Sequence, residues 1–221
     1  MRADEFLTEG RGHPVIVVDV QPEYSGMNDG EESSVFPEII KFVAINQTGP
    51  VLMFVNAEDQ GMSGDTVFDV QRYWEDTLLE MGYGKPEEEY WDEDDEYHYT
   101  EAESPIDWRR YEIVDKGYGF FRSFMDQGVD DATIIKMIRY LYQHKLNDAR
   151  QLDYDDYVAI MGSDRLQDEN FTINWTSVAQ LKRFNGAYIV GGGRNECLRE
   201  VELLMNAFNI KYRRIDSLVY G

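Results

Sequence analysis

The sequence is poor in residues that bind metals or form disulfide bonds. It has a single cysteine, Cys197, and three histidines among its 221 residues. One cysteine excludes an internal disulfide bond and any metal site built from several cysteines. The histidines, His13, His98 and His144, are too widely separated to form a metal-ligand motif. We therefore expect no bound metal and no cofactor.

Long apolar runs and basic residues are also scarce. No run approaches the ~18 apolar residues of a membrane-spanning helix, and residues 1–12 lack the apolar stretch of a signal peptide. A cytoplasmic protein without a membrane partner is the simplest expectation. The chain has 21 lysines and arginines against 43 acidic residues, a net charge of −22. Such a charge should repel nucleic acid, which is therefore not an expected partner.

The acidic excess is concentrated in one segment. Residues 87–103 contain ten acidic residues and no lysine or arginine. We interpret residues 85–105 as an exposed insertion. A solvated run is its simplest role, and a lid over a site or a partner-binding surface are the alternatives. The 43% of apolar residues suffices for one packed core, so residues 1–221 should form a single domain.

Apolar patterning predicts an α/β fold. Short buried strands are expected at 15–20, 51–55, 111–114, 186–190 and 211–215, and helices at 36–46, 66–81, 133–144, 175–184 and 197–208. Strands that alternate with helices predict a doubly wound, mostly parallel sheet with helices on both faces, a Rossmann-like three-layer α/β/α arrangement. Residues 146–172 look like a second insertion, in which 157–161 is either a strand or a short helix.

One glycine-rich turn carries the only cysteine. The segment Gly191-Gly192-Gly193-Arg194-Asn195-Glu196-Cys197 follows a predicted strand and opens a helix. Cys197 would feel the positive end of the helix dipole, which favours the thiolate, and nearby backbone N–H groups could hold an oxyanion. An ordinary buried cysteine is the alternative. A phosphate-binding turn is disfavoured, because neither G-x-G-x-x-G nor G-x-x-x-x-G-K-[ST] fits the segment.

Two charged residues lie at, or just beyond, the ends of other predicted strands, and ligand sites form at the carboxyl ends of strands in such sheets. Asp19 lies in the apolar run Val-Val-Asp-Val-Gln, where a carboxylate is costly to bury without a partner or a task. It could act as a general base. Lys116, in Asp-Lys-Gly-Tyr-Gly-Phe-Phe, could stabilise a thiolate. The alternatives are an aspartate that caps a loop and a solvent-facing lysine.

Taken together, these motifs resemble the isochorismatase-like, nicotinamidase-related cysteine hydrolases. Val15–Tyr24 is similar to the opening strand of that family, which ends in Asp-x-Gln followed by an aromatic residue. Lys116 and the aromatic residues after it resemble the catalytic lysine and its loop. Tyr188–Arg199 resembles the nucleophile turn. The resemblance covers the core elements of the chain.

The resemblance implies a catalytic triad of Asp19, Lys116 and Cys197 that cleaves a C–N bond of a small amide or ureido compound. It also implies a homo-oligomer, and a non-proline cis peptide bond near Gly192 and Gly193 that aims an amide at the oxyanion. Substrate contacts are expected in the loops after the strands, from Gln21, Tyr24, Tyr118, Phe120 and Arg194.

The chain departs from the family pattern in two places. Arg194-Asn195-Glu196 replaces the usual Thr-Asp before the cysteine, and residues 56–60 lack the Asp-x-His metal motif of nicotinamidases. The first departure leaves open a catalytically inactive member of the fold that binds a partner. A hydrolase that cleaves an ether or ester is a further alternative.

Overall fold

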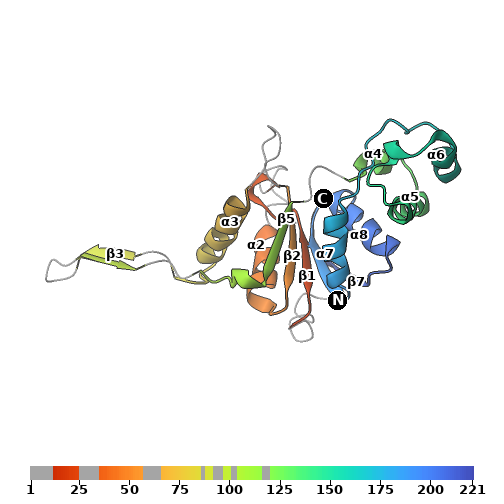
Figure 1. Ribbon diagram of the computed structural model, residues 1–221. Helices are drawn as coiled ribbons and strands as arrows, with labels where there is room; N and C mark the ends of the chain where they lie inside the picture. Colours follow the sequence, from red (N-terminus) through yellow and green to blue (C-terminus); the bar gives the residue numbers. More distant parts are fainter. Residues whose placement is uncertain are drawn as a thin grey trace.

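The computed structural model describes residues 12–24, 35–56, 66–85, 88–91, 97–100, 104–115 and 120–221. Its centre is a five-stranded sheet in the order β5-β2-β1-β6-β7 (Figure 1). The strands are β1 Val15–Val18, β2 Val51–Val55, β5 Tyr111–Asp115, β6 Ala187–Gly191 and β7 Tyr212–Val219. Every adjacent pair is parallel. The prediction of a doubly wound, parallel α/β fold is confirmed.

Helices cover both faces of this sheet (Figure 1). One face packs against α2 Phe36–Lys41, its π-helical continuation η2 Phe42–Asn46, and α3 Val67–Glu80. The other face packs against α7 Trp175–Arg183 and α8 Cys197–Ala207, and α5 Asp131–His144 packs against α8. The shorter described helices are η1 Pro22–Tyr24, η3 Trp108–Arg110, α4 Arg122–Asp126, η4 Ala149–Gln151 and α6 Tyr154–Met161.

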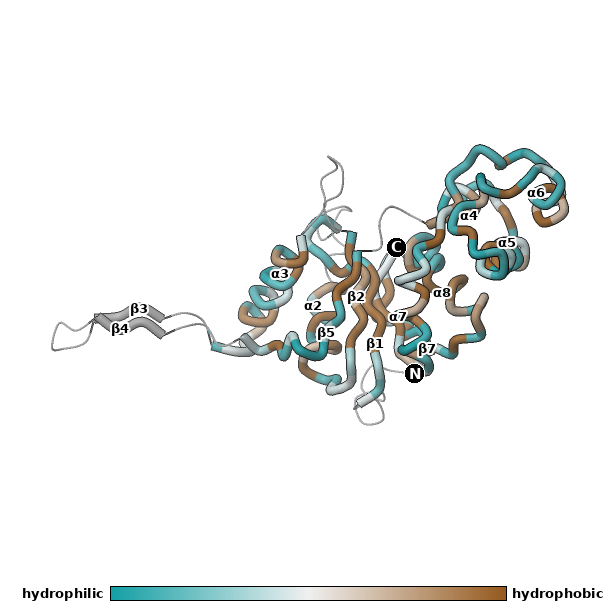
Figure 2. Tube along the Cα trace, viewed as in Figure 1, coloured by the Kyte–Doolittle hydropathy of each residue, from teal (hydrophilic) through white to brown (hydrophobic). Residues whose placement is uncertain are grey.

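The central strands separate two hydrophobic cores. Ile16 and Val18 of β1 belong to the core beneath α5, α7 and α8, whereas Val15 and Val17 belong to the core beneath α2 and α3. Successive side chains of a strand point to opposite faces, so a strand covered on both faces needs a continuous apolar run. Figure 2 shows such apolar residues along β1 and β2. The unbroken valines and isoleucine of β1 are thus explained.

Polar caps fix several helix starts. The Thr66 side chain accepts from the Asp69 N–H, and the Asp69 carboxylate accepts from the Thr66 N–H, which makes a capping box at the start of α3. Asp130 and Asn174 cap α5 and α7 through their side-chain oxygens. The predicted starts at 66, 133 and 175 therefore lie close to the observed ones.

The structure sharpens three of the predicted elements. The first strand ends at Val18 rather than at residue 20, because Asp19 has a φ of 55° and turns the chain. The last strand continues to Val219, with an irregular register between Ile189 and Gly191 of β6. Residues 157–161, for which a strand was the alternative, lie in helix α6.

Both segments interpreted as insertions contain regular structure. Within 85–105, β3 Glu88–Trp91 and β4 Tyr97–Thr100 pair antiparallel in a separate two-stranded sheet, which lies away from the central sheet in Figure 1. The charge pattern does not indicate strands here, but tyrosine and tryptophan favour β structure. Within 146–172, α6 packs against α5. Among the described helices, none is long and apolar enough to cross a membrane.

Candidate active site

The carboxyl ends of β1 and β6 meet where the strand order reverses. The chain passes from β1 to β2 on one side, whereas β6 pairs with the other side of β1. In open α/β sheets, ligand sites form at this switch point, outside the carboxyl ends of the strands. Asp19 follows β1, and the segment 191–196, which we call the glycine turn, follows β6. Two of the predicted motifs therefore lie on neighbouring strands.

Asp19 is fixed by its backbone. Its N–H donates to the Phe54 carbonyl oxygen at 3.0 Å. Its φ of 55° lies in the left-handed region, which aspartate tolerates better than most non-glycine residues. The residue is only 2% exposed. The chain thus turns sharply at the end of β1 while the carboxylate stays inside the protein.

The glycine turn lies directly against the end of β1. The Gly192 N–H donates to the Val18 carbonyl oxygen at 3.0 Å. Gly191 has a φ of 107°, and a Cβ atom there would lie 2.1 Å from the same oxygen, so only glycine fits. The described residues contain no cis peptide bond, so the expected cis bond near Gly192 and Gly193 is wrong. The positive φ of Gly191 makes the turn with trans bonds.

Tyr220 connects Asp19 to the glycine turn. Its buried hydroxyl donates to the Asp19 carbonyl oxygen at 2.5 Å. Its N–H donates to the Gly191 oxygen at 3.1 Å, and its own carbonyl oxygen accepts from the Arg194 N–H at 2.9 Å. A Cβ atom on Gly192 would lie 2.2 Å from the tyrosine ring. Sequence reasoning missed this residue, because a tyrosine after an apolar strand carries no distinguishing signal.

Cys197 is the first residue of α8. The half-buried side chain packs against the core beneath α5 and α8. The N–H groups of Glu196 and Leu198 both donate to the Gly193 carbonyl oxygen, at 2.9 and 3.1 Å, which closes the chain into the helix. A thiol in the first turn of a helix lies at the positive end of the helix dipole, which favours its ionisation. The predicted helix start at Cys197 is confirmed.

Two carboxylates beside Cys197 hold the start of α4. The Glu200 carboxylate, which is 1% exposed, accepts from the Phe121 N–H at 2.8 Å. Glu196, the residue before Cys197, forms an ion pair with Arg122. The consecutive residues Phe121 and Arg122 are thus held by carboxylates that lie on either side of Cys197 in the chain. Sequence reasoning missed these contacts, because their partners are more than seventy positions apart.

Arg122 brings a positive charge to this end of α8. Its Nε also pairs with the Asp126 carboxylate at 3.4 Å. Burial acts to lower the pKa of Arg122, but the hydrogen bond and charge of Glu196, with smaller contributions from Asp126 and Cys197, raise it above its ordinary value. The guanidinium is therefore a firmly charged group whose electrostatic neighbours include the thiol.

A second clamp joins the loops after β1 and β2. The Gln21 side-chain amide donates to the Asn56 carbonyl oxygen at 3.0 Å and accepts from the Asn56 N–H at 2.7 Å. The Asn56 side chain donates to the Tyr24 hydroxyl at 3.1 Å. Gln21 is fully buried. The amide of Gln21, an expected substrate contact, is thus engaged in holding two loops at the carboxyl edge of the sheet.

The other predicted site residues are placed as follows. Phe120 is buried in the core beneath α5 and α8. Arg194 is half-buried and its guanidinium donates to the Val219 carbonyl oxygen at 3.3 Å. Lys116 and Tyr118 lie outside the described residues. The structure thus positions Asp19 and Cys197 but gives no position for the third expected member of the triad.

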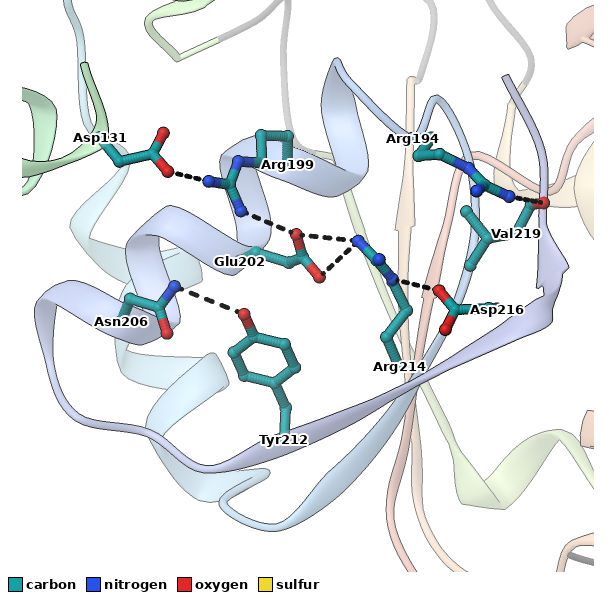
Figure 3. A network of polar contacts seen from close by, with 9 residues as sticks. All are labelled: Asp131, Arg194, Arg199, Glu202, Asn206, Tyr212, Arg214, Asp216 and Val219. Atoms are coloured by element: carbon teal, nitrogen blue, oxygen red, sulfur yellow. Dashed lines mark hydrogen bonds and ion pairs between the residues drawn. The ribbon is translucent and has the colours of Figure 1, made fainter. Parts of the chain in front are cut away.

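A charge network centred on Glu202 connects α8 to its surroundings (Figure 3). Glu202 has a side chain only 3% exposed and lies between Arg199 and Arg214, each with a nitrogen 3.3 Å from the carboxylate. Arg199 also pairs with Asp131 of α5, and Arg214 with Asp216 of β7 at 2.7 Å. The helix that begins at Cys197 is therefore tied by ion pairs to α5 and to β7.

No group of three or more histidine, cysteine, aspartate or glutamate residues in the described part of the chain is arranged to hold a metal ion. No protein-family model, curated protein or solved structure matches this sequence. The resemblance to isochorismatase-like hydrolases therefore stays a prediction, and the functional argument rests on the geometry.

Proposed function

We propose that this chain is a cysteine hydrolase that cleaves a C–N bond of a small amide or ureido compound. The observation that carries the proposal is the placement of Asp19 and Cys197. Both follow the carboxyl ends of neighbouring strands at the switch point of the sheet, and the glycine turn that leads to Cys197 is hydrogen-bonded to β1 next to Asp19. A buried carboxylate and a thiol at a helix start are the elements of an activated nucleophile.

In the proposed reaction, the Asp19 carboxylate accepts the proton of the Cys197 thiol. The thiolate attacks the substrate carbonyl carbon, and the N–H groups of Gly193 and Cys197 hold the resulting oxyanion. The C–N bond then breaks, and the leaving ammonia or amine takes the proton from Asp19. Water hydrolyses the acyl-thioester, which releases the acid and restores the thiol. Lys116 is assigned to stabilising the thiolate.

The proposal includes a cytoplasmic location, a small-molecule substrate, a homo-oligomeric assembly and no cofactor, metal, membrane or nucleic-acid partner. The net charge of −22 supports the exclusion of nucleic acid.

Thiol reactivity and ammonia release test the proposal. Because Cys197 is the only cysteine, mass spectrometry of the intact protein follows its alkylation by iodoacetamide without ambiguity. We expect alkylation at pH 7 to be at least about tenfold faster in the folded than in the urea-unfolded protein. We also expect ammonia release from at least one member of a panel of small amides and ureides, and product analysis separates this from ester or ether cleavage.

Substitutions define the roles. Cys197→Ala should abolish turnover, and Asp19→Asn, which keeps the size and backbone tolerance of aspartate, should lower kcat by about 10²-fold or more. Asp216→Asn is the matched control, since its carboxylate is 69% exposed on β7. Undiminished turnover in either of the first two variants would contradict the mechanism.

A non-catalytic binding protein is the second candidate, and the charge beside the thiol favours it. Glu196 precedes Cys197, and a neighbouring carboxylate disfavours a thiolate. Slow alkylation of the folded protein, together with no ammonia release across the panel, would select this candidate.

A further inference from the structure

The start of α8 carries an unusual set of charges around a thiol. The charged residues on the described segments that meet there are Asp19 at the end of β1, Arg122 and Asp126 of α4, Asp131 of α5, Arg194 and Glu196 of the glycine turn, and Arg199 and Glu200 of α8. Glu196 adjoins Cys197 in the chain, and Glu200 lies one helical turn beyond it. Both carboxylates would oppose ionisation of the thiol.

Arg122 is the group that counters Glu196. The two side chains form a direct ion pair, and their exposed fractions are 41% and 45%. The backbone from which Arg122 extends is anchored, because the Phe121 N–H is held by the buried Glu200 at 2.8 Å, and the Arg122 Nε also contacts Asp126 at 3.4 Å. Arg122 thus places a positive charge on the carboxylate that neighbours the thiol.

We propose that Arg122 is a positioning residue of the candidate site: it neutralises the Glu196 carboxylate and so keeps the neighbouring Cys197 thiol easy to ionise. This inference rests on the proposed function, in which Cys197 is the nucleophile. It also gives a role to the departure of the glycine turn from the family pattern, since Glu196 pairs with Arg122 at the start of α4.

The test is the pH dependence of Cys197 alkylation by iodoacetamide, which gives the pKa of the thiol directly. Arg122→Gln leaves Glu196 uncompensated, so the thiol pKa should rise by about 0.5–1 unit and alkylation at pH 7 should slow about threefold to tenfold. Arg122→Lys should retain most of the wild-type rate. Arg165→Gln is the matched control, since Arg165 is exposed and donates at 3.5 Å to the Gln127 side-chain oxygen.

The double variant separates an electrostatic role from a structural one. Arg122→Gln with Glu196→Gln removes both charges, so its thiol pKa should return to within about 0.3 units of the wild type. Glu196→Gln alone frees the charge of Arg122 and should lower the thiol pKa. That variant keeps the arginine, so it tests the inference even if Arg122→Gln fails to fold. Raising the salt concentration to about 1 M should shrink every shift.

An unchanged thiol pKa in Arg122→Gln, a double variant no closer to the wild type than the single one, or a raised pKa in Glu196→Gln would each overturn the inference. These outcomes are independent of turnover. A protein without amidase activity can still show the charge coupling, in which case only the proposed function fails. If the protein is an active hydrolase but the pKa of its thiol does not depend on Arg122, only the inference is contradicted.

Discussion

Gly192→Ala should destabilise the protein by pressing on Tyr220. The added Cβ atom would lie 2.2 Å from the ring of Tyr220, whereas non-bonded carbon atoms rest about 3.5–4.0 Å apart. The ring or the turn must therefore move by more than about 1 Å. The ring has little freedom to do so, because its hydroxyl is bonded to the Asp19 carbonyl at 2.5 Å and its ring centroid lies 4.8 Å from that of Phe36.

The expected cost follows from overpacking of a buried contact. Inserting a methyl group into a well-packed site costs about 1–3 kcal/mol, and the fixed ring places Gly192→Ala at about 2–3 kcal/mol. Backbone strain adds nothing here, since the φ of Gly192 lies outside the left-handed region. We therefore attribute the cost to the contact with the Tyr220 ring.

A double-mutant cycle tests this reasoning. Tyr220→Leu removes the ring atoms that the new Cβ would meet and should itself cost about 2–3 kcal/mol through lost packing and the lost hydroxyl bond. In that background Gly192→Ala should cost less than about 0.5 kcal/mol. Urea unfolding followed by circular dichroism measures all four proteins. Costs that add within about 0.5 kcal/mol would refute the contact as the cause.

Two further predictions concern buried polar groups, and both are measured by urea unfolding. Glu202→Gln should lower the free energy of unfolding by about 1–3 kcal/mol, which is less than for a fully buried pair because Arg199 and Arg214 are one-third exposed. Asp216→Asn should lower it by less than about 1 kcal/mol. Equal effects of the two substitutions would contradict the central role of Glu202. The Tyr157 hydroxyl is buried without a hydrogen-bond partner among the described residues, so Tyr157→Phe should leave stability at pH 7 unchanged or raise it by up to about 1–2 kcal/mol. Burial, with a smaller contribution from nearby carboxylates, raises the pKa of Tyr157 to about 12 from an ordinary value of 10.0. The folded chain therefore retains the hydroxyl proton to higher pH than the unfolded chain, and the free energy of unfolding should fall between pH 10 and 12. The phenylalanine variant should show a shallower fall, and identical slopes would count against this assignment.

The fold could be predicted from the sequence because its signals are local. The central strands are continuous apolar runs, and the side chains of Thr66 and Asn174 cap the starts of α3 and α7. Local signals also indicated Asp19, which directly follows β1, and Cys197, which begins a helix after a glycine-rich turn. The type and order of the elements are therefore specified by short windows of sequence, whereas the ends of the first and last strands are not.

The contacts that assemble the candidate site could not be predicted in this way. Tyr220 reaches Asp19 across 201 positions, and Arg122 reaches Glu196 across 74. Such pairs depend on which strands become neighbours, which periodicity does not specify. The expected cis peptide failed for a related reason, since the backbone path of the turn depends on how Gly191 meets Val18 in the folded sheet.

The pairing of β1 with β6 has a consequence for how the protein folds during synthesis. Val15 of β1 lies opposite Tyr188 of β6, so β1 cannot pair with β6 until most of the chain has been synthesised. Until then, one edge of this all-apolar strand is unpaired and can pair with other chains, which is a known route to aggregation. Non-local pairings of this kind also slow folding. Cys197 and Asp19, the proposed nucleophile and base, would therefore be among the last features to come together, and the Cys197 thiol would report on completion of the whole sheet.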